Sequence, residues 1–259
     1  MTQSESLSAK FRLDGRVAIV TGASKGIGAA IAHMLAEAGA SVVVSSRRQD
    51  AVNVVAKAID ARGGKAIAIA AHAGESSDLA RLVDATIERF GRIDVVVNNA
   101  ATNPSFGPLV DATDELFDKV MNVNLRGPLT LGRLAHPHLS ASGRGSIVNI
   151  ASVEGLSPSE GLALYSVSKA ALISLTGAMA REWGAAGIRV NAICPGLIQT
   201  KFSAALWQDE TIRQSFLSHV PSGRMGQPDE IAALALFLAS DAGSYCTGGT
   251  YVADGGYLI

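Results

Sequence analysis

The chain has 259 residues, of which 48% are apolar and 17% charged, and its 22 basic and 23 acidic side chains give a formal net charge of −1. This composition is typical of a packed globular protein and excludes a disordered one. The near-neutral balance, without a long basic run, argues against nucleic acid or an anionic membrane as the main partner. The longest apolar run, from Ile231 to Ala239, is far shorter than a membrane span.

Cysteine usage and the N-terminal residues bear on the compartment. Cys194 and Cys246 are the only cysteines, and they form neither a disulfide framework nor a zinc pattern, so we expect a reducing cytoplasm. Residues 1–10 are polar and lack the apolar core of a signal peptide. We expect them to form a flexible tail before a single domain over residues 11–259. The five histidines show no metal-ligand spacing, so no metal is expected.

The first elements form a strand, a glycine-rich loop, a helix and a second strand. Val17–Val20 is a short β-branched run, typical of a parallel strand buried on both faces. The loop that follows reads Thr21-Gly22-Ala23-Ser24-Lys25-Gly26-Ile27-Gly28, and an amphipathic helix then runs to about Ala38. Glycines in this position permit a tight turn and close backbone approach, and a helix N-terminus directs N–H groups at an anion. The unit therefore predicts a dinucleotide phosphate site.

The alternation of strands and helices continues to the end of the chain. Further strands are predicted over residues 41–45, 65–70, 93–97, 146–151, 188–193 and 249–253. Helices are predicted over 51–61, 76–90 and 113–139, around Tyr165 as far as Gly184, and from about 227 onward. Gly127-Pro128 is expected to kink the third of these, and residues 197–225 are expected to form an irregular substrate loop with helical patches. The order predicts an α/β fold in three layers, a doubly wound parallel sheet of about seven strands.

The predicted topology brings several polar segments together. Right-handed crossovers place the carboxyl ends of all parallel strands at one edge of the sheet. Gly22, Asn98, Ser152 and Pro195 each follow a predicted strand. Ligands bind at this edge in such folds, so we expect these residues to contribute to one site.

Tyr165 and Lys169 form a candidate acid–base pair. They are four residues apart in a predicted helix and therefore share one face. An ordinary tyrosine titrates about three units above neutrality, which corresponds to roughly 4 kcal/mol. An ammonium held ~4 Å away at an effective dielectric of ~20 supplies about that much. The alternative is a half-buried tyrosine with a lysine one turn along the helix.

These motifs, in this order and spacing, resemble those of the short-chain dehydrogenase/reductase family over about residues 11–259. The resemblance rests on the loop Thr21–Gly28, Asn98-Asn-Ala100, Asn124, Ser152, Tyr165-x-x-x-Lys169 and Pro195-Gly196. It implies a Rossmann fold. Residues 98–108 and 195–203 are most similar to the branch of tetrameric NADPH-dependent carbonyl reductases, so the resemblance also implies a homotetramer, with a homodimer as the alternative.

The resemblance implies a role for each residue of the catalytic set. Tyr165 would be the acid in ketone reduction and the base in alcohol oxidation, and Lys169 would lower the tyrosine pKa and bind the nicotinamide ribose. Ser152 would hydrogen-bond the substrate oxygen, and Asn124 would hold a water that links Lys169 to solvent. The implied cofactor contacts are Gly22, Ser24, Lys25, Gly26, Ile27, Gly28, Ser46, Arg47, Arg48, His72, Ala73, Asn98, Ala100, Tyr165, Lys169, Pro195, Gly196, Ile198 and Thr200.

The end of the second strand favours NADP(H) over NAD(H). Cofactors without a 2′-phosphate are usually bound there by an acidic residue, whereas this chain has Ser45-Ser46-Arg47-Arg48. A guanidinium binds phosphate through two hydrogen bonds, and Lys25 adds a second cation by the resemblance. The alternative is that Arg47 and Arg48 are ordinary surface residues.

Some positions depart from the family pattern. Ala101 stands where many members have glycine, and His72 stands where many have an aspartate near the adenine. His72 either contacts the adenine or only packs nearby. Thr200 is suited to hydrogen-bond the nicotinamide carboxamide, while Ile198 offers only its backbone and bulk. Phe202, Leu206, Trp207 and Phe216 are candidates for a substrate lid or for a subunit contact.

The sequence thus predicts an NADP(H)-dependent oxidoreductase that interconverts a small carbonyl substrate and a secondary alcohol, without nucleic acid or membrane partners. Three alternatives stay open at this point: an NAD-dependent alcohol or 3-oxoacyl reductase of the same family, a non-catalytic dinucleotide sensor, and an epimerase or dehydratase of the extended relatives. The last usually carries a longer C-terminal substrate domain.

Overall fold

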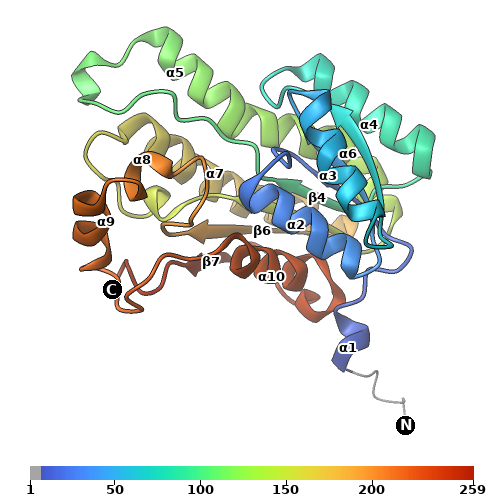
Figure 1. The fold of residues 1–259 in the computed structure, drawn as a ribbon. Coiled ribbons are helices and arrows are strands. Elements are labelled where there is room, and N and C mark those ends of the chain that lie inside the picture. The colour runs from blue at the N-terminus through green and yellow to red at the C-terminus, as the bar shows by residue number, and fades with distance from the viewer. Residues whose placement is uncertain (1–6) are drawn as a thin grey trace.

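One parallel sheet organises the chain. The computed structural model describes residues 7–259, apart from the side chains of Leu7, Ala205, Leu206 and Ile212. Within this range seven strands lie in the order β3-β2-β1-β4-β5-β6-β7, and every neighbouring pair is parallel. The strands are β1 (Val17–Val20), β2 (Ser41–Ser46), β3 (Lys65–Ala70), β4 (Val95–Asn98), β5 (Gly145–Ile150), β6 (Ile188–Pro195) and β7 (Thr250–Ala253). The predicted doubly wound α/β sheet is confirmed (Figure 1).

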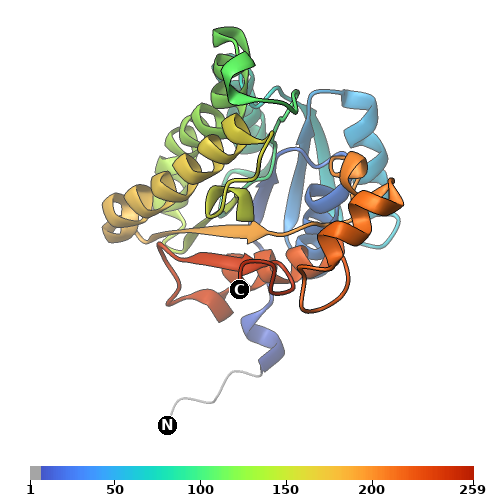
Figure 2. The same ribbon diagram turned by 90° about the vertical axis from the view of Figure 1, so that its left-hand side faces the viewer.

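Helices cover both faces of this sheet and complete three layers. One face packs against α2 (Gly26–Glu37), α3 (Gln49–Asp60) and α10 (Pro228–Ala239). The other packs against α4 (Ser76–Phe90), α6 (Gly127–Ala141) and α7 (Ala163–Trp183); Figure 2 shows α6 and α7 on the same side of the sheet. Strands β1, β4 and β5 are buried along their whole length because both faces are covered.

Four short helices lie outside these layers. They are α1 (Leu7–Lys10), α5 (Asp114–Met121), α8 (Ala204–Trp207) and α9 (Glu210–Leu217). The first belongs to the expected N-terminal tail, whose residues 1–6 lie outside the described part of the chain. The last two lie in the expected substrate loop, beside the C-terminus of the chain (Figure 1).

The helix predicted over 113–139 is interrupted. A π-helical segment, Asn122–Arg126, separates α5 from α6, and the Gly127 N–H bonds to the Asn122 carbonyl five residues back. The expected interruption of this helix at Gly127-Pro128 lies directly before these two residues. Pro128 has no N–H, so it cannot donate the bond that a regular helix would direct at the Asn124 carbonyl, and the irregularity therefore lies before the proline.

Helix α7 joins the sheet to the predicted acid–base pair. With the turn that follows it, Ala163–Ala186, it is the one stretch among the described residues long and apolar enough to cross a membrane. Leu172, Thr176 and Met179 of this helix are buried in the core, and Met179 packs with residues of α4, α6 and β6. Its apolar character is therefore that of the core helix of a folded domain.

Candidate active site

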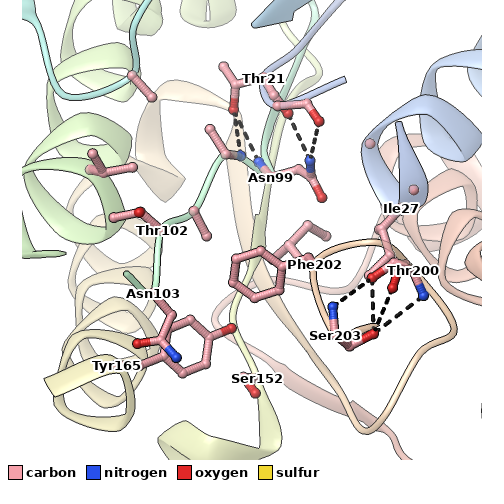
Figure 3. A pocket seen from close by; sticks show the side chains of 18 of the residues that line it. Thr21, Ile27, Asn99, Thr102, Asn103, Ser152, Tyr165, Thr200, Phe202 and Ser203 are labelled. Atoms are coloured by element: carbon pink, nitrogen blue, oxygen red, sulfur yellow. Dashed lines mark hydrogen bonds between the residues drawn. The ribbon is translucent and has the colours of Figure 1, made fainter. Parts of the chain in front are cut away.

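A cavity of about 1570 Å³ lies at the carboxyl ends of the strands. Its lining includes every site residue predicted from the sequence except Asn98 and Asn124. Figure 3 shows its centre, with Thr21 and Asn99 at the top, Tyr165 and Ser152 below, Thr200 and Ser203 at the right and the Phe202 ring between them. Segments that are far apart in the chain thus meet where the sheet topology predicts a ligand site.

The glycine-rich loop is held against the sheet by Asn99. The Asn99 side-chain amide donates to the carbonyls of Thr21, at 2.9 Å, and Gly22, at 3.1 Å. The Thr21 hydroxyl accepts the N–H groups of Asn99 and Ala100, both at 3.1 Å (Figure 3). A Cβ at Gly28 would lie 2.4 Å from the Asn99 amide nitrogen and 2.6 Å from the Gly22 carbonyl oxygen. Gly28 therefore has no room for a side chain, and the close-packed backbone of this loop fits a pyrophosphate at the start of α2.

Cationic side chains surround the far end of this loop. Lys25 directly precedes α2, and Arg47 and Arg48 directly precede α3; all three are exposed and line the cavity together with Ser46. Arg48 also lies 3.9 Å from Asp50, an exposed ion pair of little energetic weight. No carboxylate stands at residues 45–48, so the donors at the end of β2 suit an additional phosphate group.

His72 lines the cavity after β3. Its Nδ1 accepts a hydrogen bond from the Gly74 N–H at 3.1 Å, and its own backbone N–H donates to the Asp78 carboxylate at 2.7 Å. In the neutral ring the proton is therefore on Nε2, which becomes a donor where an aspartate would accept. The bond to His72 also lowers the pKa of Asp78.

Tyr165, Ser152 and Lys169 meet at the other end of the cavity. The Lys169 ammonium lies 5.5 Å from the centroid of the Tyr165 ring and donates to the Ile150 carbonyl at 2.7 Å. Burial lowers the pKa of Lys169 to about 8. Burial raises the pKa of Tyr165, while a hydrogen bond with Ser152 lowers it. The expected fall of the tyrosine pKa toward neutrality is not produced by the protein alone, because removal of water outweighs the hydrogen bond.

Asn124 and Asn98 lie behind the cavity wall. The Asn124 side chain accepts the Thr102 N–H at 2.8 Å and donates to the Thr102 carbonyl and to Ser168 Oγ, both at 3.0 Å. It is fully buried in the π-helical segment and holds Thr102, which does line the cavity. The Asn98 side chain donates to Asn149, at 2.8 Å, beneath the sheet edge. Neither side chain lines the cavity, and the roles predicted for Asn98 and Asn124 stay predictions.

The expected substrate loop closes the cavity through Thr200 and aromatic rings. Thr200 lies over the glycine loop, since a Cβ at Gly26 would be 3.3 Å from its methyl group. Ser203 holds this turn by donating to the Ile198 carbonyl at 2.5 Å. Phe202 and Phe216 line the cavity, and the Phe202 ring centroid is 6.2 Å from that of Tyr165.

The other two residues predicted to form a lid are Trp207 and Leu206. Trp207 is not a lining residue; its indole N–H donates to the Thr200 carbonyl at 3.0 Å and supports the turn from behind. The side chain of Leu206 lies outside the described part of the chain.

Comparisons with known proteins, by sequence and by structure, indicate the same protein family. The family model described as enoyl-(acyl carrier protein) reductase matches residues 22–258. Dehydrogenase/reductase SDR family member 4 of Oryctolagus cuniculus is 42% identical over 244 residues, which cover 94% of each chain. The chain belongs to the short-chain dehydrogenase/reductase family. It is an oxidoreductase of that family, and the resemblance read from its motifs is confirmed.

Solved structures of this short-chain dehydrogenase/reductase type superpose closely on the chain. A putative NAD(P)-dependent gluconate 5-dehydrogenase from Beutenbergia cavernae, with bound NADP, has a TM-score of 0.91 and 38% identity over 96% of this chain and 99% of that one. A gluconate 5-dehydrogenase from Burkholderia cenocepacia, in complex with NADP and tartrate, has a TM-score of 0.92 and 34% identity over 96% and 98%.

Sequence reasoning missed several residues of this short-chain dehydrogenase/reductase site. Asn99 and Thr21 were part of the quoted motifs. The hydrogen bonds by which they join the glycine loop to the end of β4, however, connect residues that are 78 positions apart in the chain. Glu154 was passed over although it stands two residues after Ser152 and lines the cavity. Three serines nearby, at 157, 159 and 166, were the available signal, because a buried carboxylate needs such donors.

Proposed function

We propose that this protein is an NADP(H)-dependent oxidoreductase that interconverts a ketone and a secondary alcohol, with Tyr165 moving the proton. The observation that carries the proposal is the position of Tyr165, Ser152 and Lys169 at one end of the cavity that begins at the glycine loop. A cofactor along the loop and a carbonyl at Tyr165 would therefore share one continuous space.

NADPH, when bound, supplies the hydride to the carbonyl carbon. The chain's own residues supply the rest. Tyr165 gives its hydroxyl proton to the carbonyl oxygen in reduction and takes it back in oxidation, a step that positioned groups typically accelerate by about 10²- to 10⁴-fold. Ser152 donates a hydrogen bond to the same oxygen and stabilises its developing negative charge.

Lys169 and Asn124 act around Tyr165. The Lys169 ammonium favours the tyrosinate by its charge and is suited to bind ribose hydroxyls. Asn124 acts through Thr102 and Ser168, which its side chain holds. A water relay at Asn124 stays a prediction. It is supported by Pro128, which cannot donate to the Asn124 carbonyl and so leaves it free of the regular helical bond.

NADP(H) is proposed over NAD(H) on the donors at the end of β2. This part of the cavity is lined by Ser46, Arg47 and Lys25, and residues 45–48 include no carboxylate. The two gluconate 5-dehydrogenase structures that resemble this chain contain NADP. A 2′-phosphate would find a guanidinium and an ammonium within one cluster.

We also propose a homotetramer, or failing that a homodimer, in the cytoplasm. Exposed apolar side chains support the assembly: Val167 of α7 is 49% exposed, and Val252 and Ile259 near the C-terminus are 45% and 99% exposed. Light scattering on the purified protein should give four times the 26.6 kDa of the chain. A mass of one chain would exclude the oligomer.

The catalytic proposal is tested by NADPH oxidation with a panel of ketones, diketones, acyl thioesters and oxidised sugars. We expect at least one class to be reduced, and we expect Tyr165→Phe to lose about 10²- to 10⁴-fold in kcat while it still binds NADPH. Full turnover by Tyr165→Phe would refute the mechanism. NADPH binding without oxidation by any carbonyl would favour a dinucleotide sensor instead.

A further inference from the structure

Glu154 is a half-buried carboxylate in the wall of the cavity. It lies in a short turn of 3₁₀ helix, Val153–Gly155, directly after Ser152. Its Oε2 accepts the Ser159 N–H at 2.9 Å and the Ser166 hydroxyl at 2.8 Å, and its Oε1 accepts the Ser159 hydroxyl at 2.6 Å. Hydrogen bonds to an ionised acceptor are roughly twice as strong as neutral ones, so this residue is firmly fixed.

Glu154 makes hydrogen bonds both to Ser152 and to the residue that follows Tyr165. The Glu154 N–H donates to Ser152 Oγ at 3.2 Å, which leaves the Ser152 hydroxyl proton available for another acceptor. The Glu154 side chain bonds to Ser166, the residue after Tyr165. Ser152 follows β5 and Tyr165 lies in the first turn of α7, so the spacing between them depends on how these elements are joined.

The first turn of α7 needs such a partner. Its N-cap residue, Leu162, makes no side-chain capping bond. A negative charge near the N-terminus of a helix is favourable because it meets the positive end of the helix dipole. Glu154 provides that charge from outside the helix, at the turn that carries Tyr165.

We propose that Glu154 is a positioning residue for the carbonyl–alcohol reaction. It joins the turn after Ser152 to the first turn of α7 and thereby fixes the distance between Ser152 and Tyr165. The inference rests on the proposed function. The arrangement also places one negative charge near Tyr165. The other groups that influence Tyr165 are Ser152, Lys169 of α7 and Cys194 of β6, a buried thiol. Glu154 acts against the tyrosinate and raises the pKa of Tyr165.

Two substitutions separate the geometry from the charge. In Glu154→Gln the amide oxygen can accept the Ser159 N–H and the Ser166 hydroxyl, and the amide nitrogen can donate to the Ser159 hydroxyl. The three bonds are kept and the charge is lost. Glu154→Ala removes both. Glu160, an exposed carboxylate in the same loop, provides matched controls as Glu160→Gln and Glu160→Ala.

The expected results differ between the two variants. Glu154→Ala should lower kcat roughly 10- to 100-fold, since small misplacements of reacting groups have effects of this size, while the Kd of NADPH is unchanged. Glu154→Gln should keep kcat within about threefold of the wild type, because the charge-neutral bonds retain the geometry. The midpoint of its kcat–pH profile should fall, because one negative charge near Tyr165 is removed. The midpoint falls in both directions of the reaction, because the tyrosinate becomes easier to form. Both Glu160 variants should match the wild type.

Three outcomes would overturn the inference: a kcat of Glu154→Ala near the wild-type value, a kcat of Glu154→Gln as low as that of Glu154→Ala, or an unshifted pH midpoint in Glu154→Gln. If Glu154→Ala does not fold, Ser159→Ala and Ser166→Ala remove its donors singly, and unchanged kcat in both would be equally decisive. Tyr165→Phe is measured alongside. If it keeps full turnover, the proposed function fails; if it is inactive while Glu154→Ala is active, only the role of Glu154 fails.

Discussion

The two halves of the cavity are built in different ways. The cofactor half, residues 21–28, 46–48 and 72–73, contains a glycine loop whose backbone packs so closely that a side chain at Gly22 or Gly28 would not fit. The substrate half is lined by residues 102–106, Val153, Glu154, Leu162, 200–203 and Phe216, which come from loops and short helices outside the sheet. Phe106 covers Gly161, and the Gly107 N–H donates to the Gly161 carbonyl at 3.1 Å. The first arrangement fixes one ligand shape, whereas the second can vary without disturbing the sheet.

The largest effect that would sharpen this comparison is expected at Gly28. In Gly28→Ala the new methyl group would lie 2.4 Å from the Asn99 amide and 2.6 Å from the Gly22 carbonyl. Overpacking of this kind typically costs about 1–3 kcal/mol, so the Kd of NADPH should rise roughly 10- to 100-fold. Calorimetric titration with NADPH measures it.

Gly177 is the matched control for Gly28. It lies in α7, and a Cβ there would have no neighbour within 4 Å. Gly177→Ala should therefore leave the Kd of NADPH unchanged. Equal Kd values for the two variants would mean that the tight packing of the glycine loop is not what shapes the cofactor half.

Arg47 should show the next largest effect. Arg47→Asp removes a guanidinium from the end of β2 and adds a carboxylate, so the KM of NADPH should rise about tenfold or more, as expected for a lost charged hydrogen bond, and the KM of NADH should fall. Steady-state kinetics with both cofactors gives the ratio. Arg62→Asp makes the same charge change beyond the other end of α3, away from the cavity. An unchanged KM ratio in Arg47→Asp would remove the argument for NADP(H).

The cofactor half of the cavity was easier to predict from the sequence than the substrate half. The parallel sheet of about seven strands and the glycine loop were predicted because each depends on local pattern, namely β-branched runs and glycines before a helix. The role of Arg47, read from the residues that end a strand, stays a prediction. The meeting of Gly22, Ser152 and Pro195 at one edge followed from the topology of parallel sheets, whereas the place of Tyr165 beside Ser152 was implied by the family resemblance.

Contacts between distant segments could not be predicted in this way. Asn124 lies in a π-helical segment, and its amide bonds to Thr102, 22 residues away in the chain, which no local pattern shows. The pKa of Tyr165 was misjudged because sequence spacing shows Lys169 but not the burial of the hydroxyl. The walls of the substrate half depend on pairs such as Phe216 and Tyr257, 41 residues apart, for which one sequence carries no periodic signal.

The smallest effect is expected for the stacked pair of Phe216 and Tyr257. It tests whether the cofactor half and the substrate half of the cavity bind their ligands independently. The Phe216 and Tyr257 rings are stacked, with centroids 4.7 Å apart and planes at 12°. Asp254 orders the tail that carries Tyr257 by accepting the Gly256 and Leu258 N–H groups. Since such ring pairs contribute about 0.5–1.5 kcal/mol, Tyr257→Ala should raise the KM of the carbonyl substrate roughly two- to tenfold.

The Kd of NADPH should not change in Tyr257→Ala, because the stack touches only the substrate half. Tyr257→Phe keeps the ring and should restore the wild-type KM. Tyr245→Ala removes a fully exposed ring elsewhere near the C-terminus and should have no effect. If Tyr257→Ala weakened NADPH and the carbonyl substrate equally, the loop would act on both ligands. The substrate half would then be coupled to the cofactor half through Thr200, which lies over the glycine loop.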